Sequence, residues 1–101
     1  MNSEFKPEFQ YVRVIAQNGF TAAEVRENLR AFLVEECRLT EDETALFISN
    51  TAEDTDVARL REIADDFGFD HLRGVCNAVG LNMGSQLRVL NGCRRVFGLL
   101  S

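Results

Sequence analysis

The chain has 101 residues, a length typical of one domain that buries its own core without a metal ion or a disulfide. Hydrophobic residues make up 46% and charged residues 27%, which is a globular composition and excludes a disordered chain. The net charge of −5 argues against general binding of nucleic acid or of an anionic membrane surface by the whole molecule. We expect a single domain over residues 1–101.

The charges are divided unevenly along the chain. Residues 1–70 carry all sixteen acidic residues against seven basic ones, a formal charge of −9. Residues 71–101 carry four arginines and no acid, a formal charge of +4. Surfaces of opposite charge attract each other, a second copy or a charged partner.

The three cysteines and the single histidine do not form a metal-binding pattern. The sequence has no C-x-x-C pair and too few histidines for a zinc finger. We expect buried, reduced thiols, no metal and no cofactor. The N-terminus lacks a signal-peptide core and no run of 18 apolar residues occurs, so we expect a cytoplasmic protein.

In chain order, the first expected helix covers 7–17 and has Pro7 in its first turn. The rival interpretation is a strand near 9–16, because that stretch is rich in β-formers. Thr21 and Glu24 have capping-box spacing and predict a helix that runs to about Arg38.

Thr40 and Glu43 repeat the capping-box spacing and predict a short helix over 41–49, although the apolar run also fits a strand near 44–49. A further helix is expected at about 55–67, with Phe67 on its buried face and Gly68 ending it.

Asp70 is expected to cap a helix over 71–79 that Gly80 ends. For the last segment, Asn91 and Gly92 between apolar runs indicate a hairpin, but the apolar residues share one helical face. We therefore predict a helix over about 85–98, in which Gly92 costs about 1 kcal/mol.

The predicted fold is all-α, a compact bundle of five or six short helices. The alternative is α+β, with the two strands named above and a C-terminal hairpin over 86–98. The core residues share the buried phase of their helices. They are Val25, Leu29, Phe32, Leu60, Ile63, Phe67, Leu72, Val75, Leu90 and Phe97.

The segment 80–96 resembles the end of a sterile alpha motif domain, over about 20 residues. A glycine-apolar turn, Gly80-Leu81, and a second glycine, Gly84, precede a long helix. The likeness departs from the family in having one residue fewer before Gly84, and in Ser85 and Gln86 where His and Arg are common. The resemblance implies a five-helix protein-interaction domain that often polymerises head to tail.

The segment 14–20, followed by Val25 and Leu29, is similar to the opening two helices of a ubiquitin-associated domain. That resemblance implies that a glycine-aromatic loop, here Gly19-Phe20, contacts ubiquitin. The third helix of that family would come late here, because residues 38–43 intervene. A hydrophobic staple before the 21–38 helix explains Phe20 as well.

A DNA-binding helix-turn-helix over 71–95 is the alternative function. Apolar and glycine positions from Val75 to Val89 fit that motif, although Gln86 breaks one of them. Catalysis lacks support, because no nucleophile accompanies His71 and the acidic runs lack the spacing of a calcium loop. We expect no catalytic residue and no enzyme activity.

The sequence therefore predicts a non-catalytic protein–protein interaction module. Its basic C-terminal helix would dock on an acidic surface, of a partner or of a second copy bound head to tail. The candidate binding residues combine the C-terminal arginines with neighbouring amides. They are Arg73, Gln86, Arg88, Asn91, Arg94 and Arg95.

Overall fold

The computed structural model describes residues 22–52 and 55–98, which form five α-helices and no strand. The helices are α2 (Ala22–Glu35), α3 (Glu41–Ser49), α4 (Val57–Phe67), α5 (Phe69–Ala78) and α6 (Met83–Phe97). The all-α prediction is confirmed, and the strand near 44–49 and the hairpin over 86–98 are wrong. The helix or strand expected before residue 18 and the Thr21 cap lie outside the described residues.

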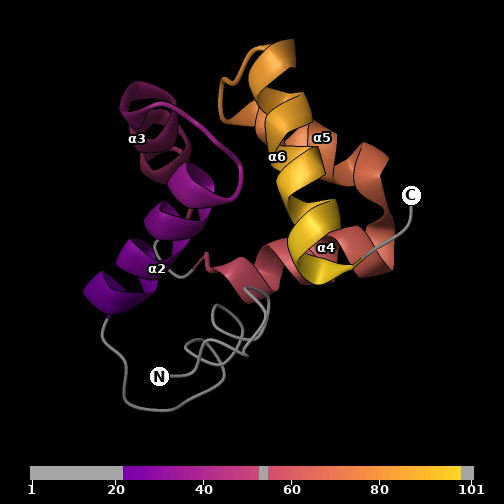
Figure 1. The fold of residues 1–101 in the computed structure, drawn as a ribbon, viewed down its shortest axis with the longest axis horizontal. Helices are drawn as coiled ribbons and strands as arrows, with labels where there is room; N and C mark the ends of the chain where they lie inside the picture. Colours follow the sequence, from indigo (N-terminus) through magenta and orange to yellow (C-terminus); the bar gives the residue numbers. More distant parts are fainter. Residues whose placement is uncertain (1–21, 53–54, 99–101) are drawn as a thin grey trace.

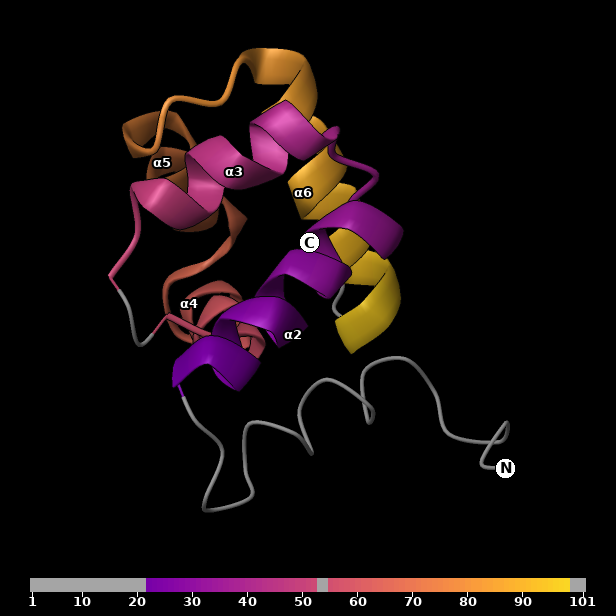
Figure 2. The same ribbon diagram turned by 90° about the vertical axis from the view of Figure 1, so that its left-hand side faces the viewer.

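The helices form two pairs that meet at α4. Figure 1 shows α2 and α3 on one side of the molecule, α5 and α6 on the other, and α4 below them. The chain neighbours α2 and α3, α4 and α5, and α5 and α6 are in contact, and α4 also contacts both α2 and α6. Figure 2 shows α3 above α2, with α6 running past both. Among the described residues, no helix has the length and apolar character needed to cross a membrane.

Side-chain caps start three of the helices. Thr40 and Glu43 form the predicted capping box of α3, with Thr40 N donating to Glu43 Oε1 at 2.9 Å. Asp56 caps α4 and Asn82 caps α6 through their side-chain oxygens. The Asn82 cap explains why α6 begins two residues before the predicted start.

The predicted C-terminal end of α2 and the predicted start of α5 are wrong, because residues with positive φ angles lie at these positions. Helix α2 ends at Glu35, and Arg38 takes a positive φ of 60° in the loop that follows. Helix α5 begins at Phe69 directly after Gly68, whose φ of 89° turns the chain between α4 and α5. Asp70 therefore lies in the first turn of α5 and does not cap it.

The core joins all five helices, and most of its predicted members are buried. Leu60, Leu72 and Phe97 are examples, whereas Val25 and Val75 are only partly buried. The prediction for Phe67 is wrong, because its side chain is 59% exposed. Helix α4 ends at Phe67 and the chain turns at Gly68, so no later helical turn covers the ring.

The three cysteines are free thiols buried in the core, as predicted. Burial raises the pKa of the Cys76 thiol to about 12. The pKa of Cys37 is also raised, by a hydrogen bond with Cys93 and by burial. Cys37 and Cys76 act as small packing groups, since their thiolate form is disfavoured.

Candidate interaction surfaces

Arg88 of α6 forms hydrogen bonds within its own molecule, to the first turn of α3 and to the connection between α2 and α3. Its Nη2 lies 2.9 Å from Glu43 Oε2, and its Nη1 donates to the Arg38 carbonyl at 2.8 Å. It also donates to Ser85 Oγ at 3.1 Å, and the Ser85 hydroxyl donates to Glu43. Arg88, one of the four arginines of the basic segment 71–101, is thus paired with a carboxylate of its own molecule.

Glu43 is the centre of this network. It completes the capping box of α3 while it accepts hydrogen bonds from Ser85 and Arg88 of α6. The hydrogen bond from Ser85, the backbone N–H of Thr40 and the Arg88 guanidinium lower the pKa of Glu43 to about 2. One carboxylate therefore both starts a helix and fastens that helix to α6.

The same side of α6 approaches the chain closely at Gly92. A Cβ atom there would lie 2.7 Å from Cys37 Sγ and 2.9 Å from the Glu36 carbonyl oxygen. Arg95 donates to that Glu36 carbonyl and lies 3.5 Å from Glu36 Oε1. We call the set Glu36, Cys37, Glu43, Arg88, Gly92 and Arg95 the clamp, because it holds the α2–α3 connection against α6.

Arg94 and Asn91 lie on another side of α6. The Arg94 guanidinium stacks 4.7 Å from the centre of the Phe69 ring of α5, and its Nη1 donates to Asn91 Oδ1 at 3.2 Å. Arg94 Nε is buried and has no hydrogen-bond partner among the described residues. Arg94 therefore covers the α5–α6 contact.

The remaining two candidate binding residues, Arg73 and Gln86, line a hollow of about 440 Å³ between α5 and the start of α6. Gln86 is buried and its Nε2 donates to the Leu81 carbonyl at 2.8 Å, so its amide serves the turn between the helices. Arg73 is exposed and forms no ion pair with any other residue that the structure describes. Four of the six candidate binding residues therefore donate hydrogen bonds within the fold, namely Gln86, Arg88, Arg94 and Arg95. Asn91 accepts the hydrogen bond from Arg94, and Arg73 is exposed.

Two large apolar side chains are exposed in the first half of α6. Met83 is 69% exposed and Leu87, one helical turn later on α6, is 48% exposed. Met83 also lines the hollow with Arg73. We call Arg73, Met83 and Leu87 the tip.

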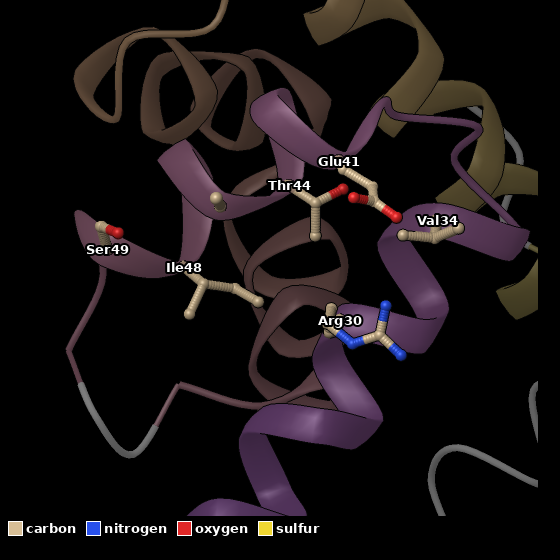
Figure 3. Close-up of a pocket in the computed structure, with 7 residues that line it drawn as sticks. Arg30, Val34, Glu41, Thr44, Ile48 and Ser49 are labelled. Carbon is tan, nitrogen blue, oxygen red and sulfur yellow. The ribbon is translucent and has the colours of Figure 1, made fainter.

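A groove of about 420 Å³ lies between α2 and α3. Figure 3 shows Thr44 and Ile48 of α3 reaching toward α2, where Val34 and Arg30 lie opposite them, with Glu41 at the rim. Thr44 is 3% exposed, and its hydroxyl has no hydrogen-bond partner within the described residues. A buried hydroxyl without a partner is unusual in a native interior. We call this set, with Ala45 and Ser49, the groove.

Of the tip, the sequence predicted only Arg73, and neither the groove nor the exposure of Phe67 was predicted. Met83 falls at the start of a helix that was expected to begin two residues later, and the groove combines residues of two helices. Helical phase did contain one signal, since Leu87 lies outside the buried arc of α6. In the described part of the chain, no cluster of three or more His, Cys, Asp or Glu side chains has a metal-binding arrangement.

Comparison with protein families, curated proteins and solved structures gives no match for this chain. The resemblances to sterile alpha motif and ubiquitin-associated domains stay predictions from short segments.

Proposed function

We propose that this chain is a non-catalytic protein–protein interaction module whose tip docks into the groove of a second copy, head to tail. The observation that carries the proposal is the pairing of an exposed apolar projection with an apolar groove on the same molecule. Met83 and Leu87 provide the projection, and Val34, Ala45 and Ile48 line the groove. Apolar groups that are exposed together are typical of interaction sites.

The charges around the two surfaces are complementary. The described segment that contains the groove, residues 22–52, has seven acidic and three basic side chains. The tip contributes Arg73, and the groove has Glu41 at its rim. Arg30, which also lines the groove, is paired with Glu27. Opposite charges at the margin of an apolar contact favour one orientation and increase the association rate.

The tip and the groove belong to different helices, because α5 and α6 carry the tip and α2 and α3 line the groove. Glu43 of α3 faces α6, where it bonds to Ser85 and Arg88. Ala45 and Ile48 face α2 instead, across the groove. A contact between two different surfaces is heterologous and can add further copies, so short oligomers are expected.

The clamp favours this proposal over the DNA-binding alternative. Arg88 and Arg95, which the alternative needs for phosphate contacts, bond to Glu43 and Glu36 of their own molecule. The Gln86 amide, which would read a base edge, is bonded to the Leu81 carbonyl. Releasing these groups would break hydrogen bonds of the fold before any contact with DNA formed.

Sedimentation of the full chain at low and high salt tests the proposal. We expect oligomers that weaken as salt screens the charged margin. Leu87→Glu removes the tip and Ala45→Arg fills the groove, so each variant alone should be monomeric. A mixture of the two should form dimers only, because each retains one intact surface. Arg59→Gln on α4 is the control, since it changes the net charge as Leu87→Glu does.

The outcomes separate the alternatives. Unchanged oligomers for both variants would overturn the proposed contact. A monomeric chain that shifts random duplex DNA in a gel, and loses that shift at high salt, would support the DNA-binding alternative. A monomer that binds no DNA would reject both.

A further inference from the structure

The corner between α4 and α5 has an exposed aromatic pair. The Phe67 ring is 59% exposed and contacts the His71 ring, with 5.0 Å between ring centres and 37° between planes. Gly68 separates the two helices, and a Cβ there would meet nothing within 4 Å. A single exposed phenylalanine is ordinary in a protein surface. The charges around this one make it informative.

Carboxylates flank the ring in the sequence. Asp66 precedes Phe67, and Asp70 lies one residue before His71. Both are exposed, and neither forms a hydrogen bond or an ion pair within the part of the chain that the structure describes. Asp65 differs, because it lies 3.6 Å from Arg61. We call Asp66, Phe67, Asp70 and His71 the corner.

The fold already uses arginine on phenylalanine twice near this position. Arg94 lies 4.7 Å from the centre of the Phe69 ring, two residues after Phe67. Arg61 lies 5.8 Å from the centre of the Phe97 ring. In both contacts the guanidinium comes from the same chain, whereas no cation–π contact to Phe67 occurs among the described residues.

From these observations we propose that the corner binds an arginine-containing basic segment of a partner protein. One guanidinium would lie on the open part of the Phe67 ring, and Asp66 and Asp70 would accept its N–H groups or those of a neighbouring arginine. Arginine fits better than lysine, because its planar group stacks on a ring while its edge donates to carboxylates. The site goes beyond the proposed head-to-tail contact, since its occupant is a different molecule and none of its residues belongs to the tip or the groove. Asp70 does line the same hollow as Arg73 and Met83 of the tip, so Asp66 is the carboxylate of the corner that lies apart from the tip.

Titration of the full chain with synthetic peptides, followed by NMR amide shifts, tests this site. The probes are an Arg–Gly repeat peptide and matched Lys–Gly and Glu–Gly repeats at low salt. We expect the arginine peptide to shift resonances of residues 65–72 and to bind at least about threefold more tightly than the lysine peptide. The glutamate peptide should not bind.

Variants identify the contacts. Phe67→Ala should raise the Kd of the arginine peptide at least about fivefold, and Phe67→Tyr should preserve binding. Asp66→Asn with Asp70→Asn should weaken binding most at low salt. Asp42→Asn, which neutralises an exposed acid of α3, is the matched control and should leave the Kd nearly unchanged.

Equal affinity of Phe67→Ala and the parent chain, equal loss with Asp42→Asn, or shifts centred outside the corner would overturn the proposal. A peptide-free oligomer that Phe67→Ala dissociates would also overturn it, because the occupant would then be a second copy. The Leu87→Glu variant keeps the two proposals apart. It should bind the arginine peptide normally even though it lacks the tip, so either proposal can fail without the other.

Discussion

The clamp and the corner both combine carboxylates with arginines or aromatic rings, yet they differ in how their polar groups are used. In the clamp, Glu43 and Arg88 bond to each other across two helices, and Gly92 lets the backbones approach. In the corner, Asp66 and Asp70 have no such partner within the described residues, and Phe67 is exposed. The clamp therefore stabilises the fold, and the corner is left accessible to another molecule.

A charge pattern in a sequence therefore does not reveal which charged side chains form ion pairs within the fold. The C-terminal arginines are the strongest pattern in the chain, but Arg88 and Arg95 serve the clamp. Changes in the clamp should alter stability, whereas changes in the corner should alter binding and leave stability almost unchanged.

The largest expected effect contrasts two phenylalanines. Phe97 is 4% exposed and stacks on Phe32 with 5.6 Å between ring centres, so Phe97→Ala should lower the free energy of unfolding by about 3–5 kcal/mol. Phe67→Ala should change it by less than about 1 kcal/mol, because water already covers most of the ring. Chemical denaturation of both variants gives the comparison, and equal losses would show that the corner is part of the core.

The next effect contrasts two helical glycines. Gly92→Ala would place a Cβ against Cys37 Sγ and the Glu36 carbonyl, and the backbone must shift to relieve the contact. We expect a loss of about 1–3 kcal/mol in the free energy of unfolding, as overpacking usually causes.

Gly74→Ala on α5 is the control for Gly92→Ala. A Cβ at Gly74 would meet nothing within 4 Å, so the better helix propensity of alanine should raise the free energy of unfolding by about 0.5–1 kcal/mol. Thermal midpoints that move in opposite directions confirm the close approach. A stabilised Gly92→Ala variant would contradict it.

The pH dependence of the free energy of unfolding tests the role of Glu43, and its expected effect is smaller. Its pKa is about 2 in the folded chain and 4.5 for an ordinary glutamate, so the unfolded chain takes up its proton first as the pH falls. The stabilisation from Glu43 is complete above about pH 5 and is lost progressively toward pH 2. Because Glu43 is partly exposed, we expect about 1–2 kcal/mol of this loss to come from it.

Glu43→Gln provides the comparison for the pH effect. The variant should be less stable than the parent chain near pH 7 and should show a smaller fall in stability between pH 5 and pH 2. Asp66→Asn in the corner should leave the stability at neutral pH unchanged within about 0.5 kcal/mol. Denaturation midpoints of the three proteins, measured across this pH range, test the prediction. An equal change of midpoint with pH in all three would show that the clamp is unimportant.

Helices with local start and stop signals could be predicted from the amino-acid sequence. The capping box of Thr40 and Glu43 starts α3, and Gly68 ends α4, because each signal acts within one helical turn. The apolar phase of 85–98 separated a helix from a hairpin correctly, since the buried apolar side chains on one face of α6 outweigh the cost of one glycine. Seven of the ten core residues predicted from helical phase are buried.

The contacts of the surface side chains depend on how the helices pack and could not be predicted from the sequence. From the sequence, Gly92 was only a residue of low helix propensity, but the close approach of Cys37 requires a glycine there. Arg88 counted as a free charge, but Glu43 lies 45 positions earlier in the sequence and reaches it only after folding. Phe67 fitted the buried phase of its helix, but the turn at Gly68 left it exposed. Each of these depends on contacts between segments distant in the sequence, or on the direction of a turn, which local periodicity does not contain.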